Sequence, residues 1–239
     1  MPRFSVKTEN GKAKITDEAY RHLTRSLRAK TGDIIEITDG ENNYTAVIDN
    51  IDKSAAYISV LERCETDTEP KVRVTLIQGL PKGEKSELII QKCVELGVYE
   101  IVFFAAERSI VKLDNKQKTA KLERYNKIAA SAAEQCGRAI VPSVCIADSL
   151  NEALSKAENT VLVYEKATDG ASLRSVISNE NTKSFSYIIG PEGGIGESEL
   201  SLCREKNIPQ ITLGKRILRT ETAAIAVLAS AMCLLGEME

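Results

Sequence analysis

The chain has 239 residues, and its 32 Lys and Arg residues against 34 Asp and Glu residues give a net charge of −2. An apolar content of 43% argues against a disordered chain, and the longest apolar run falls short of the roughly 18 residues of a membrane helix. The chain has one histidine and no Cys-x-x-Cys pair among its six cysteines, which argues against a zinc site and against Ser-His-Asp catalysis. It has no apolar N-terminal segment, which argues against secretion. We therefore expect a cytoplasmic globular protein with buried free thiols.

The first 70 residues are predicted to form a small β-rich domain with one helix. The helix begins after Thr16, a typical N-cap, and ends at Gly32. The predicted strands are residues 34–37, 44–48 and 57–61. A turn is predicted at Asp39-Gly40, and the polar residues 62–70 are predicted to be a linker.

After residue 70 the pattern predicts alternating strands and helices, which is typical of an α/β fold with a mainly parallel sheet. The predicted strands are residues 72–78, 101–104, 141–146, 161–163, 187–189 and 210–213. The predicted helices are residues 82–96, 115–135, 197–206 and 221–235, and a capping box at Ser149–Glu152 opens another. Gly196 and Thr220 are the predicted N-caps of the last two helices. The final helix is apolar nearly all round, so we expect it to be buried in the core or at a subunit interface.

Charge is unevenly distributed along the chain. Residues 1–30 hold eight Lys and Arg against three Asp and Glu, a balance of +5, and residues 31–70 hold two against ten, a balance of −8. Residues 108–138 again hold eight against three, a balance of +5. Such segregation indicates surfaces with different partners, although helix faces that neutralise each other in the fold would give the same pattern.

Three glycine-marked loops follow predicted strands, at residues 163–166, 189–196 and 213–220. The carboxyl ends of parallel strands are where such sheets bind ligands, and glycine lets the backbone approach a ligand closely. None of the loops contains a dinucleotide or P-loop fingerprint, and each alone could be an ordinary tight turn. Their convergence on one sheet edge, together with the basic residues of the third loop, predicts a ligand site.

Longer motifs surround these loops. They are GPEGG at residues 190–194, LGKRILRTETA at 213–223, RHLTRSLR at 21–28, LPKGEK at 80–85, QKCVELG at 91–97, ERS at 107–109 and AAEQCGR at 132–138. Over nearly its whole length the chain resembles the RsmE-type 16S rRNA uridine-N3 methyltransferases of the SPOUT class. It departs from them at Ile195-Gly196, where that family usually has Phe-Ser; this exchange leaves the loop glycines intact.

The resemblance implies a PUA-like RNA-binding β-barrel in residues 1–70 and a trefoil-knotted SPOUT methyltransferase domain in residues 71–239. It also implies S-adenosyl-L-methionine as cofactor, 16S rRNA or the small ribosomal subunit as partner, and a homodimer formed through the SPOUT domain, without metal or membrane. The implied cofactor-binding residues are Leu162, Val163, Glu165, Gly190, Pro191, Glu192, Gly193, Leu213, Gly214, Ile217, Leu218 and Thr220.

Uridine N3 becomes a nucleophile only when it loses its proton, so a nearby cation should stabilise the anion and a carboxylate could accept the proton. The candidate cations are Arg138 and Arg219, and the candidate carboxylates are Glu134 and Glu221. Either glutamate could instead have a structural role, Glu221 as a helix-start residue and Glu134 as an arginine's partner.

Binding of RNA requires cations that face the phosphates. The candidates are Arg21, Arg25 and Arg28 in the first domain, and Lys82, Arg108, Lys215 and Arg216 in the second. A further basic stripe runs from Lys112 to Lys127, and Tyr164 is a candidate for stacking on a flipped base.

Three other interpretations remain open from the sequence. The chain could be a non-catalytic RNA-binding factor in ribosome assembly, or an SPOUT enzyme that methylates a different RNA position. It could also use its glycine-rich loops to bind a nucleotide phosphate.

Overall fold

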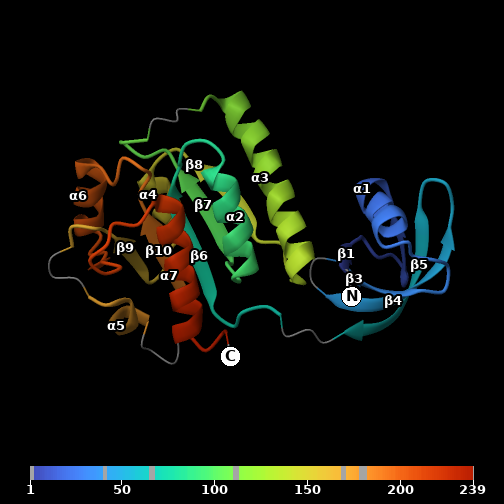
Figure 1. The fold of residues 1–239 in the computed structure, drawn as a ribbon. Helices are drawn as coiled ribbons and strands as arrows, with labels where there is room; N and C mark the ends of the chain where they lie inside the picture. Colours follow the sequence, from blue (N-terminus) through green and yellow to red (C-terminus); the bar gives the residue numbers. More distant parts are fainter. Residues whose placement is uncertain are drawn as a thin grey trace. The chain divides into compact units, whose positions relative to one another are not determined.

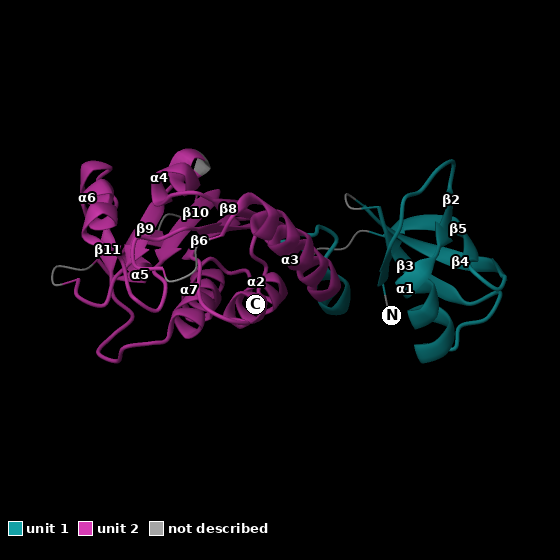
Figure 2. Ribbon diagram, turned by 90° about the horizontal axis from the view of Figure 1, so that it is seen from above, with its two compact units in different colours: residues 1–69, 133–141 teal, residues 70–132, 142–239 magenta. Residues whose placement is uncertain are grey.

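The computed structural model describes residues 3–39, 42–64, 68–109, 113–167, 171–177 and 182–238 (Figure 1). The chain forms two compact units, which Figure 2 distinguishes by colour. Unit 1 consists of Met1–Glu69 and Ala133–Val141, and unit 2 of Pro70–Ala132 and Pro142–Glu239. Gly40 of the predicted turn and Lys112 of the predicted basic stripe lie outside the described residues.

Unit 1 is built on a five-stranded sheet with the order β1-β3-β4-β5-β2. Its strands are β1 (Arg3–Ser5), β2 (Lys12–Ile15), β3 (Ile34–Thr38), β4 (Asn43–Ile51) and β5 (Ala56–Cys64). The β1–β3 pair is parallel and the other pairs are antiparallel. The sheet curls around a core of alternating strand residues such as Ile35, Ile37 and Ile58, which Leu23 completes from the helix.

The helix of unit 1 is shorter than the sequence predicts. It consists of α1 (Asp17–Arg21) and a π-helical turn (His22–Ser26), so it ends before Gly32. Thr16 occupies the N-cap position with an extended backbone but makes no capping hydrogen bond, because its hydroxyl donates to Asp17 Oδ2 at 2.8 Å. Strand β5 also continues to Cys64, so the strand enters the segment predicted as a linker.

Polar contacts join residues 133–141 to the rest of unit 1. The Arg3 guanidinium donates to the carbonyl oxygen of Gly137, and the Thr38 hydroxyl donates to the carbonyl oxygen of Ala139 at 3.2 Å. Arg138 is buried, and its Nη2 lies 2.7 Å from Glu69 Oε2. These contacts explain why a segment distant in the sequence belongs to the same compact unit.

Unit 2 contains a six-stranded sheet with the order β11-β9-β10-β6-β7-β8, and all its pairs are parallel. The strands are β6 (Arg73–Gly79), β7 (Glu100–Phe104), β8 (Ser143–Ala147), β9 (Thr160–Val163), β10 (Ser184–Ile189) and β11 (Gln210–Ile211). The predicted α/β fold with a mainly parallel sheet is therefore confirmed. The trefoil knot stays a prediction.

Helices cover both faces of this sheet (Figure 1). They are α2 (Lys85–Glu95), α3 (Asn115–Cys136), α4 (Leu150–Ala153), α5 (Leu173–Ile177), α6 (Glu197–Glu205) and α7 (Thr220–Leu234). On one face, α4 and α6 contribute Leu150 and Leu200 to a core with Ile77, Val102 and Ile188. On the other face, α2 packs against α7, and Tyr125 of α3 stacks at a tilt on Phe103 with ring centroids 5.2 Å apart.

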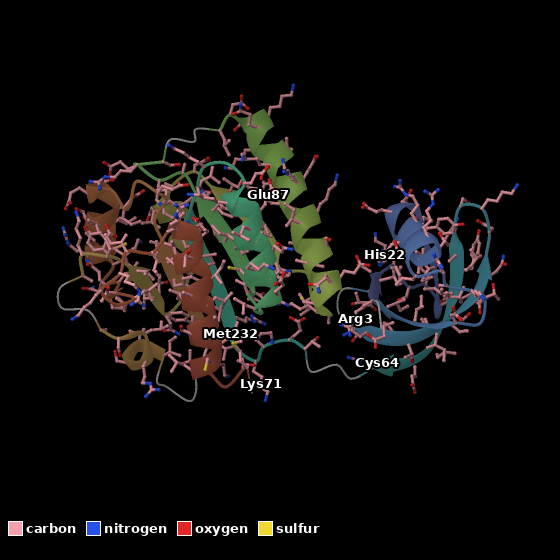
Figure 3. The ribbon with its side chains drawn as sticks, viewed as in Figure 1. Arg3, His22, Cys64, Lys71, Glu87 and Met232 are labelled. Atoms are coloured by element: carbon pink, nitrogen blue, oxygen red, sulfur yellow. The ribbon has the colours of Figure 1, made fainter. Side chains whose placement is uncertain are left out.

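Helix α7 buries one face in the core and exposes the other, so the predicted burial in the core holds for one face only; burial of the other at a subunit interface stays a prediction. Val227 and Leu228 are fully buried, whereas Cys233 is exposed and Leu234 is 38% exposed. The Tyr187 hydroxyl donates to the carbonyl oxygen of Ala224 at 3.0 Å and joins the helix to β10. Figure 3 labels Met232 near the end of the helix.

The predicted capping signals have mixed outcomes. Ser149 caps α4, because its hydroxyl accepts a hydrogen bond from the Glu152 N–H at 3.2 Å, and Gly196 is the N-cap of α6. Thr220 is not an N-cap. It is the first residue of α7, Arg219 is the N-cap, and the threonine hydroxyl makes contacts described below.

Within the described parts of the chain, no helix combines the length and the apolar character that crossing a membrane requires. No three His, Cys, Asp or Glu side chains of those residues are grouped as metal ligands would be. All six cysteines are free, but only Cys93 and Cys203 are buried, so the expectation of buried thiols is right for these two only.

The cysteines should differ sharply in reactivity. Burial raises the pKa of the Cys93 thiol to about 12 and that of Cys203 to about 11, so neither forms the reactive thiolate near neutral pH. We expect iodoacetamide to label exposed Cys233 first in the native protein, and Cys93 and Cys203 only after unfolding, as followed by peptide mass spectrometry. Labelling of Cys93 at the same rate as Cys233 would contradict this burial.

Candidate functional site

A pocket of about 480 Å³ lies in unit 2 at the carboxyl ends of β9, β10 and β11. The strands end in register, because Ile189 pairs with Val163 and Val163 pairs with Ile211. Three loops therefore begin at one edge of the sheet. Their lining residues are Val163, Tyr164 and Glu165; Ile189 to Ile195; and Thr212 to Thr220, joined by Lys85 and Ala223.

The loop after β10 packs so closely on its neighbours that it requires glycine. A Cβ on Gly193 would lie 2.7 Å from the carbonyl oxygen of Arg108, and one on Gly79 would lie 2.7 Å from the nitrogen of Pro191. Gly194 has a φ of +74°, and its N–H donates to the Pro191 carbonyl oxygen at 2.9 Å, which closes a tight turn. The GPEGG motif thus brings the main chain to the pocket wall without intervening side chains.

The buried Gln78 side chain at the end of β6 joins this loop to α7. Its Nε2 donates to the Thr220 hydroxyl and to the Gly79 carbonyl oxygen, both at 2.9 Å. The Thr220 hydroxyl in turn donates to the carbonyl oxygen of Gly190 at 2.7 Å. The start of α7 is therefore tied to the loop that follows β10, which is why Thr220 does not cap its own helix.

A second polar network supports the far end of the same loop. The buried Glu199 carboxylate accepts hydrogen bonds from the Gly196 N–H at 2.8 Å and from the Glu107 N–H at 2.9 Å. Hydrogen bonds from the Ser198 side chain and backbone lower the pKa of the Glu107 carboxyl. The start of α6 and the ERS motif therefore hold each other in place.

Charges of both signs lie at the pocket wall. Lys85 Nζ lies 2.8 Å from Glu192 Oε1 and 3.6 Å from Glu221 Oε2. The Glu192 carboxylate raises the pKa of the Lys85 ammonium. Burial alone would raise the pKa of Glu192, but hydrogen bonds from Lys85 and from backbone N–H groups outweigh it and lower that pKa. Glu192 therefore stays ionised well below neutral pH.

The structure places every predicted cofactor-binding residue except Leu162 in the pocket lining. Leu162 is fully buried in the core between the sheet and the α4 and α6 helices. Lys85 lines the pocket although the sequence did not single it out as a site residue. Lys85 belongs to the LPKGEK motif, which could have drawn attention to it. No sequence pattern indicates, however, that the start of α2 lies beside loops more than 100 residues away in the chain.

The predicted catalytic residues fall into two sets. Arg219 lines the pocket, and Glu221 contacts Lys85. Arg138 and Glu134 belong to unit 1, where the Arg138 guanidinium is bound to Glu69. Burial raises the pKa of Glu134. The structure therefore places Arg219 and Glu221 near the pocket. The contact that it shows for Arg138 is the ion pair with Glu69.

The predicted RNA-binding residues are all exposed. Arg21, Arg25 and Arg28 lie in unit 1 along α1 and the segment after it. Lys82 and Arg108 flank the loop after β10, because the Lys82 N–H donates to Glu192 at 3.2 Å and the Arg108 carbonyl abuts Gly193. The remaining two, Lys215 and Arg216, line the pocket.

Comparison with known proteins assigns the family. A family model described as an RNA methyltransferase domain matches residues 68–232, and one described as an RNA methyltransferase PUA domain matches residues 15–61. Ribosomal RNA small subunit methyltransferase E of Bacillus subtilis is 35% identical over 225 residues, which cover 90% of this chain and 88% of that protein. The chain belongs to the ribosomal RNA small subunit methyltransferase E family.

Other members of the family agree with this assignment. The Mesomycoplasma hyopneumoniae enzyme is 30% identical over 90% of this chain and 91% of its own length. The Neisseria gonorrhoeae enzyme, which was crystallised with S-adenosyl methionine bound, is 32% identical to this chain in sequence. The two structures superpose with a TM-score of 0.87 over 98% of each chain. The sequence-based identification of the family, of its RNA methyltransferase activity and of the PUA-like first domain is thereby confirmed.

Removing the Thr220 hydroxyl should destabilise the protein at the pocket. A Thr220→Val variant keeps the shape of the side chain but loses the hydrogen bonds that its hydroxyl makes with Gln78 at 2.9 Å and Gly190 at 2.7 Å. The Gln78 amide and the Gly190 carbonyl oxygen then retain the longer bond of 3.3 Å between them. We expect the free energy of unfolding to fall by about 1–3 kcal/mol, measured by urea denaturation.

The matched control is Thr222→Val, on the same helix but exposed to solvent. It should change stability by less than about 0.5 kcal/mol. Equal effects of the two substitutions would show that the hydroxyl network does not hold the pocket.

Proposed function

We propose that this protein transfers a methyl group from S-adenosyl-L-methionine to N3 of a uridine in 16S ribosomal RNA. The observation that carries the proposal is the pocket in which the GPEGG and LGKRILRT loops converge. The fold of the whole chain supports it, because the Neisseria gonorrhoeae relative of the same architecture was crystallised with S-adenosyl methionine. Ribosomal RNA of the small subunit is the substrate in the names of the relatives.

The pocket suits this cofactor in size and in chemistry. Its volume of about 480 Å³ is that of an ordinary small-molecule site. Val163, Leu213 and Leu218 offer apolar surface to a purine ring, and the backbone of the glycine loops offers hydrogen-bonding groups to its edge. The residues that would hold the cofactor are the predicted set without the Leu162 side chain.

When bound, the cofactor supplies an electrophilic methyl group. The chain must supply a deprotonated uridine and hold it in line. Arg219 is suited to stabilise the uridine anion, because it lines the pocket and has no ion-pair partner among the described residues. Glu221 is suited to accept the proton, because its Oε2 is buried without a hydrogen-bond partner in the described chain. For Arg138 and Glu134 a catalytic role stays a prediction.

The rest of the chain would deliver the RNA. We assign RNA binding to the PUA-like domain of residues 1–70 through Arg21, Arg25 and Arg28, and to the cations around the pocket in the methyltransferase domain of residues 71–239. Phosphate contacts need such exposed Lys and Arg side chains. The cytoplasm is the proposed location, because the ribosomal substrate is there.

Loss of the protein should remove one methyl group from one uridine of 16S rRNA. We expect nuclease digestion and mass spectrometry of rRNA from a deletion strain to show this loss, and the wild-type gene to restore it. Calorimetry should show that the purified protein binds S-adenosylmethionine and not ATP. An unchanged rRNA would favour a non-catalytic assembly factor, and loss at another position would correct the site of methylation.

The same substrate allows a test of the two arginines in single-turnover methylation. Arg219→Ala should lower the rate by about 10²-fold or more while cofactor binding persists, because the anion loses its stabilising charge. An unchanged rate for Arg138→Ala, with normal cofactor binding, would remove Arg138 from the mechanism and leave it the contact with Glu69.

We also propose a homodimer formed through the second domain. The exposed side of α7 carries Cys233 and Leu234, and exposed apolar side chains on a helix are typical of a subunit contact. Light scattering at micromolar concentration should give twice the chain mass of 26.1 kDa. A Leu234→Glu variant should shift the protein toward monomer, and a monomeric wild type would contradict the proposal.

A further inference from the structure

The loop between β11 and α7 carries an apolar side chain that the pocket does not bury. Ile217 is 85% exposed, whereas the other exposed large apolar side chains of the described residues are between 37% and 56% exposed. A single exposed apolar residue is ordinary on a protein surface. Ile217 differs from an ordinary one because it stands on a loop that lines the candidate site.

The position of Ile217 is restricted on both sides. Before the loop, Ile211 belongs to the sheet as the last residue of β11. After the loop, the Thr220 hydroxyl donates to the Gly190 carbonyl oxygen at 2.7 Å, and Leu218 between them is half-buried in the pocket lining. Ile217 is branched at Cβ, which restricts rotation about χ1. The loop therefore holds a stiff apolar side chain in solvent beside the pocket.

Cations lie next to this side chain. Lys215 and Arg216 precede it and Arg219 follows it, all three are exposed, and none has an ion-pair partner among the residues that the structure describes. A partner that covers Ile217 must therefore bring negative charge. A second copy of the chain, docked two-fold on this loop, would bring the same cations against them. RNA brings phosphates together with the apolar faces of its bases, so it matches both the cations and the isoleucine.

The target atom gives a reason for such a side chain. N3 of uridine lies on the base-pairing edge, so the base must leave its stack before a methyl donor in a pocket can reach it. Proteins that open base stacks insert apolar side chains such as isoleucine into the gap. Tyr164, the aromatic candidate for stacking, is half-buried against the core of the sheet, so its ring stays inside the pocket. Ile217 stands outside the pocket and can enter the gap.

We propose that Ile217 is a wedge that fills the gap in the RNA base stack when the target uridine turns into the pocket. Lys215 and Arg216 bind the phosphates beside that gap. Ile217 then contributes only its main chain to the cofactor site, while Leu218 faces the cofactor. The proposal rests on the proposed function, because it assumes that the substrate is a uridine in RNA.

Side-chain variants of Ile217 test the proposal on 16S rRNA and small ribosomal subunits from the deletion strain. Ile217→Ala should lower the single-turnover methylation rate at saturating RNA by about tenfold or more, because nothing then holds the stack open. Calorimetric affinity for S-adenosylhomocysteine should change by less than about twofold, since the lost atoms face solvent. Ile217→Met keeps an apolar side chain of similar length and should restore most of the rate. Lys215→Met should instead weaken RNA binding and lower the slope of its salt dependence by about one.

Met238→Ala is the matched control, because Met238 is also an exposed apolar residue but lies outside the pocket lining. It should change neither the rate nor the affinity. An unchanged rate for Ile217→Ala, or a loss of S-adenosylhomocysteine affinity that accounts for the lower rate, would overturn the proposal. Conversion of the protein to monomer by Ile217→Ala, seen by light scattering, would assign the side chain to a second copy of the chain and overturn it as well. Failure of the wild-type protein to methylate either RNA would instead overturn the proposed function.

Discussion

The pocket depends on the hydrogen bonds of one buried amide. Gln78 is the second-to-last residue of strand β6, and its Nε2 donates to the Thr220 hydroxyl, which in turn donates to the Gly190 carbonyl oxygen. These contacts join a strand to a loop and a helix that lie more than 100 residues further along the chain. Because the Gln78 and Thr220 side chains are buried, loss of these hydrogen bonds would be costly, and the loops therefore have little freedom to separate. The three loops can then present main-chain atoms to a ligand in a fixed arrangement.

Glycine at the pocket wall serves close packing as much as backbone conformation. Gly193 lies against the Arg108 carbonyl and Gly79 lies against Pro191, and neither place leaves room for a Cβ. The charged side chains then stand around a wall made of backbone. The shape of this wall is therefore determined by main-chain atoms, which substitution of side chains cannot easily alter.

Much of this arrangement could be predicted from the sequence, since the order of strands and glycine loops requires that the loops share a sheet edge. The side-chain directions could not. Leu162 and Val163 are neighbours on one strand, yet the alternation of side chains sends Leu162 into the core and leaves Val163 at the pocket. Thr220 is a residue type typical of N-caps, but its hydroxyl donates instead to the Gly190 carbonyl oxygen at 2.7 Å. Lys85 and Arg138 depend on partners distant in the sequence, which no local pattern reveals.

The contacts of residues 133–141 with Arg3, Thr38 and Glu69 make the first unit discontinuous in sequence. During synthesis, its β-strands leave the ribosome long before the segment that completes them. The residues of unit 2 from Pro70 to Ala132, near the end of α3, must be made first. The two units therefore cannot mature strictly one after the other, and a fragment that ends at residue 70 would lack the Ala133–Val141 segment against which Arg3 and Glu69 are buried or bonded in the whole protein.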